Sequence, residues 1–222
     1  METSSKFVVA MISFLKICGV RNKEELKIVE NYANATGVIV SESKRRVSLD
    51  VVREIIEAAK IPVFLVSTLN NFKEWRDLID KTEAEYVQIH TDSITPKEVD
   101  KIKSEFDVYI IKAFKIPRSS KDVVKDAEKI ISKIESYEVD RILLDTGKGS
   151  GKTHDHRISK IIAQKFNVIL AGGLNPENVC EIAKFVEPYG LDVSSGVEKN
   201  GRKYEDLIVR FVERLKSVQV LK

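Results

Sequence analysis

Residues 168–198, VILAGGLNPENVCEIAKFVEPYGLDVSSGVE, contain one complete strand–helix–strand unit. The short apolar run Val168–Leu170 ends at paired glycines. Asn175-Pro176 then opens a stretch with apolar residues three and four apart, which predicts a helix. A second short strand follows over Leu191–Val193. Two strands joined by a helix are typical of a parallel sheet with a right-handed crossover.

The same alternation continues outward from this unit over most of the chain. Each predicted strand is a short β-branched run, and each is followed by an amphipathic stretch. The predicted strands are Phe14–Cys18, Gly37–Val40, Val63–Val66, Tyr86–Ile89, Val108–Lys112, Arg141–Leu144, Val168–Leu170 and Leu191–Val193. The predicted helices are Glu24–Asn34, Leu49–Ala59, Phe72–Asp80, one from Thr95, Asp122–Glu135, one around Arg157–Gln164, one from Asn175, and Tyr204–Lys216. Eight such units predict an α/β fold, a closed (β/α)8 TIM barrel in a single domain. A doubly wound open sheet is the alternative.

The composition indicates a globular protein with a buried core. Of its 222 residues, 43% are hydrophobic and 32% are charged. The net charge of +3 is too small and too evenly spread for a nucleic-acid footprint. No stretch reaches the roughly 20 apolar residues of a membrane span. Two distant cysteines, Cys18 and Cys180, offer neither a disulfide framework nor a CxxC metal site, so we expect a reducing, cytoplasmic location.

We assign residues 14–217 to the catalytic barrel and residues 1–13 to an N-terminal extension. Lys6 and the apolar run after it have the outline of a signal peptide, but Glu2 precedes them and the small-residue cleavage pattern is missing. We expect residues 1–10 to be dispensable, either as an upstream start or as a short extension packed against the bottom of the barrel. A chain that starts at Met11 should therefore keep its activity.

The loops after the last two predicted strands predict an anion site. Gly172 and Gly173 follow one strand, and Ser195 and Gly196 follow the other. Glycines let backbone N–H groups approach an anion closely, and a helix N-terminus behind them adds favourable partial charge. In TIM barrels these two loops frequently hold a phosphate. The alternative is that both are ordinary tight turns.

Two further strand ends carry groups suited to proton transfer. Cys18 ends the first predicted strand and Asp145 follows the sixth, so both would lie at the catalytic mouth of a barrel. A carboxyl group there is costly unless it is paired or catalytic. The thiol and the carboxyl suit base and acid roles on opposite sides of a small substrate. The alternatives are that Cys18 is a small core residue and that Asp145 orders the loop after it.

Arginines and histidines follow other strands. Arg45 and Arg46 lie after the second strand, where a guanidinium can hold a carboxylate in bidentate fashion, although a solvated basic loop is equally compatible. His90 ends the fourth strand and is expected to line the pocket. His154 and His156 alternate at a helix start with no third ligand nearby in sequence, so a metal site is not expected.

A glycine-rich loop over residues 146–153, TGKGSGKT, superficially resembles a nucleotide-binding P-loop. The spacing is wrong, because no glycine stands five residues before the Gly151-Lys152-Thr153 triplet. We predict instead a flexible loop that covers the substrate. Cys180 lies among apolar residues of the seventh predicted helix, and core packing is its expected role.

Five motifs together resemble the N-(5'-phosphoribosyl)anthranilate isomerase family of tryptophan biosynthesis. They are KICGV at Lys16–Val20, VQIH at Val87–His90, ILLD at Ile142–Asp145, LAGGLNPENV at Leu170–Val179 and LDVSSGVE at Leu191–Glu198. The resemblance spans residues 14–216. It implies a TIM-barrel isomerase that carries out an Amadori rearrangement of a small phosphorylated substrate, with no cofactor, metal, nucleic acid or membrane. It leaves monomer and homodimer open.

The resemblance also implies roles for individual residues. It makes Cys18 the general base, Asp145 the general acid and Arg45 the residue that holds the anthranilate carboxylate. The expected substrate-binding residues are Arg45, His90, Asp192, Gly172, Gly173, Ser195 and Gly196, with Asp192 on the anthranilate side and the last four at the phosphate.

The chain departs from the family pattern at several positions. Ser43-Lys44-Arg45 replaces Ser-Pro-Arg, Thr91 replaces a glycine, Lys148–Gly151 replaces Gly-Gly-Thr-Gly, and His154–His156 replaces Phe-Asp-Trp. The first change leaves open whether Arg45 or Arg46 holds the carboxylate. Three other functions remain as alternatives. They are an indole-glycerol-phosphate synthase-like lyase that uses Lys112, a non-catalytic phosphosugar-binding barrel, and a thiol redox protein.

Overall fold

The structure is a computed structural model that describes residues 12–146 and 153–219. Most of the predicted N-terminal extension, residues 1–11, and the centre of the predicted substrate-covering loop, residues 147–152, lie outside the described residues. The dispensability of the extension and the covering role of the loop therefore stay predictions.

Eight parallel strands close into a barrel. They are β1 (Phe14–Cys18), β2 (Ala35–Ile39), β3 (Val63–Ser67), β4 (Tyr86–Ile89), β5 (Tyr109–Lys115), β6 (Arg141–Asp145), β7 (Val168–Leu170) and β8 (Gly190–Val193). Neighbours in sequence are neighbours in the sheet, and β1 pairs with β8, with Phe14 opposite Gly190. The predicted (β/α)8 TIM barrel is confirmed, and the doubly wound open sheet is excluded because the sheet has no edge.

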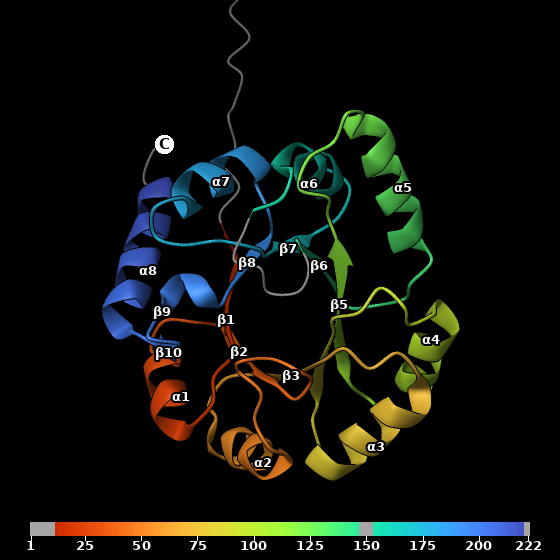
Figure 1. Ribbon diagram of the computed structural model, residues 1–222, viewed down its shortest axis with the longest axis vertical. Helices are drawn as coiled ribbons and strands as arrows, with labels where there is room; N and C mark the ends of the chain where they lie inside the picture. The colour runs from red at the N-terminus through yellow and green to blue at the C-terminus, as the bar shows by residue number, and fades with distance from the viewer. Residues whose placement is uncertain (1–11, 147–152, 220–222) are drawn as a thin grey trace, which may run out of the picture.

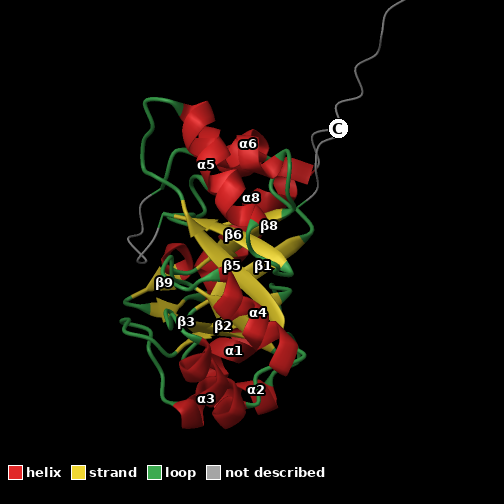
Figure 2. Cartoon of the chain, turned by 90° about the vertical axis from the view of Figure 1, so that its right-hand side faces the viewer, coloured by secondary structure: helices red, strands yellow, loops and turns green. Residues whose placement is uncertain are grey.

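The helices form a ring around the barrel (Figure 1). They are α1 (Lys23–Val29), α2 (Leu49–Ala58), α3 (Phe72–Thr82), α4 (Pro96–Glu105), α5 (Val123–Glu135), α6 (His156–Ala163), α7 (Val179–Val186) and α8 (Glu205–Gln219). Between β8 and α8 lie a short 3-10 helix, η1 (Ser195–Val197), and the two-stranded hairpin β9 (Glu198–Lys199) and β10 (Arg202–Lys203). Figure 2 shows the strands running through the middle of the molecule with helices on either side.

Polar residues fix where most helices begin. Asn22, Ser48, Asn71, Thr95 and Asp122 each accept a hydrogen bond from a backbone N–H in the first turn of the helix that follows. These caps satisfy donors that have no partner within the helix. The start of α4, with Pro in the first turn after a Thr cap, is the predicted one.

Two helices are shorter than predicted, for local reasons. The helix predicted over Glu24–Asn34 ends at Val29. Asn34 is tied to β1 instead, because its side-chain oxygen accepts a hydrogen bond from Leu15 and its backbone N–H donates to the Leu15 carbonyl. The seventh helix begins at Val179 and not at Asn175, whose side chain caps a turn before the helix.

The core has two layers that follow from the alternation of side chains along each strand. Residues such as Ile17 and Leu144 face outward and pack against the helices. Residues such as Val66, Ala113 and Leu143 face inward and fill the barrel. No helix in the described ranges combines the length and apolar character that crossing a bilayer requires.

One strand boundary matters for function. The sequence pattern predicts that the fifth strand ends at Lys112, but β5 continues to Lys115. Lys112 therefore lies within the strand, and it has the same parity as Phe114, which packs outside the barrel. Its ammonium group lies 4.8 Å from the centre of the Phe114 ring and donates hydrogen bonds to the carbonyls of Thr91 and Ala113.

Candidate active site

Polar side chains converge inside the barrel at the carboxyl ends of the strands. Cys18 ends β1, Asp145 ends β6 and Asp192 lies near the end of β8, and all three side chains are buried. His90 follows β4 directly. The sequence alternation that turns these residues inward also turns their neighbours outward into the layer beneath the helices. The functional groups are thus mounted on rigid strands at the face where TIM barrels carry their chemistry.

A buried lysine lies beside the thiol. Lys16 is two residues before Cys18 on the same face of β1, and its Nζ lies 2.9 Å from Oδ2 of Asp192. A methyl group at Gly37 would lie 2.9 Å from Cys18 Sγ and 3.2 Å from Lys16 Nζ. Gly37 of the neighbouring strand β2 therefore leaves room for both groups. Lys16, Cys18 and Asp192 form one buried cluster.

Opposing effects set the protonation of this cluster. Burial raises the pKa of the Cys18 thiol, and the positive charge of Lys16 partly offsets this by favouring the thiolate. Burial also acts against the charged form of Lys16, but Asp192 and Cys18 outweigh it, and the pKa of Lys16 is raised. The raised pKa favours the charged form of Lys16 beside the thiol. Burial likewise raises the pKa of Asp192.

A histidine holds the carboxyl group of β6. His90 Nε2 lies 3.0 Å from Asp145 Oδ2, and His90 Nδ1 lies 3.4 Å from the amide nitrogen of Gln88. The two ring nitrogens of His90 thus link the side chain of Gln88 to the carboxyl group of Asp145. His90 directly follows β4, two residues after Gln88, so both side chains face the inside of the barrel. This chain of contacts orients the carboxyl group of Asp145.

Gly172 makes room for the same carboxyl group. A methyl group there would lie 2.8 Å from Asp145 Oδ1 and 2.5 Å from Thr146 Oγ1. Gly172 also has φ of +91°, and Gly173 has φ of +70°. A side chain at Gly172 is therefore excluded both by the left-handed backbone and by contact.

The two predicted phosphate loops touch each other. A methyl group at Gly196 would lie 1.8 Å from the carbonyl oxygen of Leu174, so the backbone of η1 rests directly against the loop after β7. Asn178 stabilises that loop by donating a hydrogen bond to the Gly173 carbonyl at 2.9 Å. Ser195 is exposed at the surface of this pair of loops. The loops thus form one continuous glycine-rich backbone surface, which suits a phosphate group.

The loop after β2 contributes one arginine to the mouth. Arg45 donates from Nε and Nη2 to the two carboxylate oxygens of Glu198, at 2.6 and 2.8 Å. Its Cδ lies over Gly19, one residue after the thiol. Oε1 of Glu198, which accepts from Arg45 Nε, also accepts a hydrogen bond from Lys203 Nζ at 2.8 Å. Arg46, in contrast, is exposed to solvent, so the geometry distinguishes the two candidate arginines.

Comparisons with known proteins identify the family. The sequence profile described as N-(5'phosphoribosyl)anthranilate (PRA) isomerase matches residues 15–214. The N-(5'-phosphoribosyl)anthranilate isomerase of Methanococcus maripaludis strain C5 is 56% identical over 208 residues, which cover 93% of this chain and 100% of the relative. The solved structure of the Pyrococcus furiosus isomerase is 51% identical, with a TM-score of 0.86, over 92% of this chain and 98% of the other.

The chain belongs to the N-(5'-phosphoribosyl)anthranilate isomerase family.

A further structure of a phosphoribosylanthranilate isomerase extends the comparison to a bound ligand. That protein is in complex with reduced 1-(o-carboxyphenylamino)-1-deoxyribulose 5-phosphate. It is 29% identical to this chain, with a TM-score of 0.75, over 92% of this chain and 98% of the other. The ligand of that protein carries a phosphate and an aromatic carboxylate.

Three residues of this isomerase-family site were missed by sequence reasoning. The position of Lys16 could have been predicted from the sequence, because it precedes Cys18 by two residues in a strand and therefore lies on the same face. The positions of Glu198 and Lys203 could not have been predicted. The contacts of Glu198 with Arg45 and Lys203 depend on how the hairpin β9–β10 folds. Sequence spacing carries no signal for such a contact.

Some residues that the sequence suggested as candidates lie away from the site. Lys112 faces the helices, outside the barrel. Cys180 is only half-buried, with its sulfur 3.9 Å from Ser217 Oγ, so the prediction that it packs in the core is wrong. It lies between α7 and α8, where two helices leave it partly accessible.

His154 is buried, with its Nε2 2.7 Å from Ser159 Oγ, and burial lowers the pKa of His154 to about 4. Over residues 12–146 and 153–219, His, Cys, Asp and Glu form no group of three that could hold a metal.

Proposed function

We propose that this chain converts N-(5'-phosphoribosyl)anthranilate to 1-(2-carboxyphenylamino)-1-deoxyribulose 5-phosphate, a step of tryptophan biosynthesis. Membership of the family supports the reaction. The observation that carries the catalytic assignment is that a thiol, Cys18, and a carboxyl group, Asp145, both face the inside of the barrel mouth from strands that are not neighbours. A substrate bound between them would meet a base on one side and an acid on the other.

Asp145 is the proposed general acid. It donates a proton to the ribose ring oxygen, the bond between that oxygen and C1 breaks, and the nitrogen lone pair forms the C1=N bond of a Schiff base. The contact of Asp145 with His90 supports this role, because it holds the carboxyl group in one orientation. The nitrogen of the substrate accepts the electrons in the next step, so the scheme requires neither metal nor cofactor.

Cys18 is the proposed general base. As a thiolate it removes the proton from C2, and the electrons of that C–H bond form a C1=C2 double bond while nitrogen becomes neutral again. The enolamine then loses its hydroxyl proton and gains a proton at C1, which gives the ketone. Lys16 supports the role of Cys18, because its positive charge favours the thiolate in a buried place.

The anchoring groups hold the two ends of the substrate. We assign the phosphate to the loops with Gly172, Gly173, Ser195 and Gly196. The anthranilate carboxylate is assigned to Arg45. Glu198 occupies the Nε–Nη2 edge of that guanidinium, so the carboxylate would bind along the Nη1–Nη2 edge. Asp192 and His90 are assigned to the walls between the two anchors. Anchoring at both ends supplies orientation.

The competing functions are less well supported. A lyase that uses Lys112 would need this amine at the mouth, but it packs against Phe114 behind the strand. A dithiol redox function would need a second thiol near Cys18, whereas Cys180 lies on the outer helix α7. A barrel that only binds phosphosugars would have no use for a thiol and an acid together.

The experiment that tests this function is the loss of substrate fluorescence on mixing phosphoribosylanthranilate with the purified chain in a buffer that contains a metal chelator. We expect catalytic loss of the signal, unchanged by the chelator, with formation of the deoxyribulose phosphate. No loss beyond the spontaneous rate would contradict the proposal. A dependence on added metal would contradict the acid–base scheme.

We also propose that the chain acts in the cytoplasm. Both cysteines are free in the structure over the described ranges. Free thiols are typical of a reducing compartment. The expected state of Cys18 as a working thiolate also requires that it is not oxidised.

A further inference from the structure

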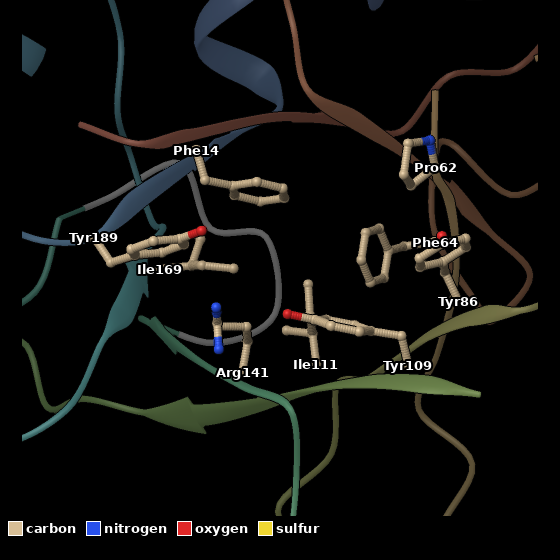
Figure 3. Close-up of a pocket in the computed structure, with 9 residues that line it drawn as sticks. All are labelled: Phe14, Pro62, Phe64, Tyr86, Tyr109, Ile111, Arg141, Ile169 and Tyr189. Carbon is tan, nitrogen blue, oxygen red and sulfur yellow. The ribbon is translucent and has the colours of Figure 1, made fainter. Parts of the chain in front are cut away.

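A cavity opens at the end of the barrel opposite to the candidate active site. Its lining residues come from the beginnings of the strands, such as Phe14 in β1, Tyr86 in β4 and Tyr109 in β5, and from Tyr189 just before β8 (Figure 3). The cavity volume is about 210 Å³. A smaller apolar cavity, of about 150 Å³, is enough to hold benzene. The space at the bottom of this barrel is therefore large enough for a single aromatic ring with one substituent.

The walls of the cavity are aromatic and meet at angles that suit a further ring. The Phe64 ring packs edge-on against Tyr86 and Tyr109, with centroid distances of 5.3 and 6.1 Å. Phe14 and Tyr189 stack at 6.4 Å on another part of the lining. Rings prefer edge-to-face or offset partners at such distances. An aromatic ligand would continue this arrangement.

One charged side chain belongs to the lining. Arg141 begins β6, and its guanidinium carbon lies 4.8 Å from the centre of the Tyr189 ring. Nη1 donates to the Asp140 carbonyl at 2.9 Å, but the buried Nε has no hydrogen-bond partner in the described structure. Among the described residues no carboxylate forms an ion pair with Arg141. The adjacent Asp140 is engaged elsewhere, with the backbone N–H of Ile110 and with Lys103.

An arginine in this state calls for an anion. A guanidinium group that lines a mostly apolar cavity and has no carboxylate partner among the described residues carries an uncompensated charge, which an anion in that cavity would neutralise. Guanidinium groups bind carboxylates in planar, bidentate fashion. Charge complementarity thus selects an anionic occupant, while volume and lining select an aromatic one.

We propose that the bottom of the barrel is a second binding site, for a small aromatic carboxylate of the size of benzoate. The ring lies among Phe64, Tyr86 and Tyr109, and the carboxylate faces Arg141. The site is separate from the candidate active site, because its residues lie at the amino ends of the strands. One side chain connects the two regions: Phe64 lines the cavity, and Lys16 Nζ of the buried cluster lies 5.9 Å from the centre of its ring.

The test is a titration of the full chain with sodium benzoate, followed by methyl NMR. Ile111 and Ile169 both line the cavity, and their methyl groups report on it directly. We expect saturable shifts of these two signals. Benzyl alcohol has the same ring and no charge, and should bind at least tenfold more weakly. Saturating the candidate active site with the reduced reaction product should leave the shifts of Ile111 and Ile169 unchanged.

Two variants separate charge at the cavity from charge in general. Arg141→Gln should weaken benzoate binding by about tenfold or more. Arg214→Gln, at an exposed position of α8, should leave it unchanged. Equal affinity for benzoate and benzyl alcohol would overturn the proposal without any variant. Two further results would overturn it. One is the loss of the shifts when the candidate active site is saturated, and the other is the absence of any shift at Ile111 and Ile169.

Discussion

At the scale of single residues, Lys16 favours the ionised form of the buried thiol that we propose as the base. Burial alone would keep Cys18 protonated at neutral pH, whereas a nearby ammonium group lowers the cost of the thiolate. The same ammonium group is itself held by Asp192 at 2.9 Å. A carboxylate that lines the mouth therefore has a second task, which is to fix the charge next to the base.

Lys16→Met should move the pH profile. The thiolate forms as pH rises through the pKa of Cys18, so kcat/KM should rise with pH over that range. Removing the positive charge raises this pKa further, because Lys16 favours the thiolate and Asp192, which remains, disfavours it. The rising limb of the profile should therefore move to higher pH, and part of the lost activity should return there.

Lys112→Met is the matched control for this measurement. Lys112 is also a fully buried lysine, but it lies outside the barrel wall, with a pKa lowered to about 8 by burial. Its removal should leave the position of the limb unchanged, whatever it does to stability. If the rising limb of the kcat/KM profile lies at the same pH in Lys16→Met and in the unsubstituted chain, the proposed effect of Lys16 on the thiol is contradicted.

The two arginines of the β2 loop should differ in the same assay. Arg45→Ala should raise KM by about tenfold or more, since hydrogen bonds to charged groups contribute about 1.5–3 kcal/mol and 1.4 kcal/mol is tenfold. Arg46→Ala is the natural control, because Arg46 is exposed. Equal effects of the two substitutions would mean that the loop acts as a diffuse positive field, and KM should then depend strongly on salt.

At the scale of elements, the proposed phosphate site depends on the contact between η1 and the loop after β7. Gly196→Ala would drive its new methyl group into the Leu174 carbonyl, at 1.8 Å before any adjustment. We expect the two loops to separate, with a higher KM and a loss of about 1–3 kcal/mol in the free energy of unfolding, as in other overpacked sites.

Gly201→Ala separates this effect from backbone strain. Gly201 has φ of +71° but nothing within 4 Å of an added methyl group. This substitution should cost about 1–2 kcal/mol of stability and leave KM unchanged. Denaturant unfolding and steady-state kinetics on both variants would measure the two effects. A normal KM for Gly196→Ala would remove the argument that the touching loops hold the phosphate.

Element boundaries show where sequence reasoning fails. The strands could be predicted to within a few residues because β-branched runs have a strong local signal, but the end of β5 could not. Nothing in the run Tyr109–Lys115 marks Lys112 as interior to the strand. Its burial depends on hydrogen bonds to the carbonyls of Thr91 and Ala113, and these exist only after folding.

At the scale of the whole molecule, the barrel could be predicted because it is an eightfold repetition of one local pattern. The strand ends then brought Cys18, Asp145 and the glycine loops to one face by topology alone. Contacts between distant side chains were not predictable in this way. The pairing of Arg45 with Glu198, 153 residues later, and the cavity around Arg141 both depend on closure of the barrel.

The central claim is that Cys18 and Asp145 carry the base and the acid. The most direct test is kcat for Cys18→Ala and Asp145→Asn, measured alongside the affinity of each variant for the reduced product. General acid or base catalysis contributes about 10²–10⁴-fold to the rate. Each substitution should therefore lower kcat by about 10²-fold or more. Product affinity should stay within a few-fold, because the phosphate and carboxylate anchors are untouched. Near-normal turnover in either folded variant would contradict the assignment, with His90 then the first other candidate for the acid.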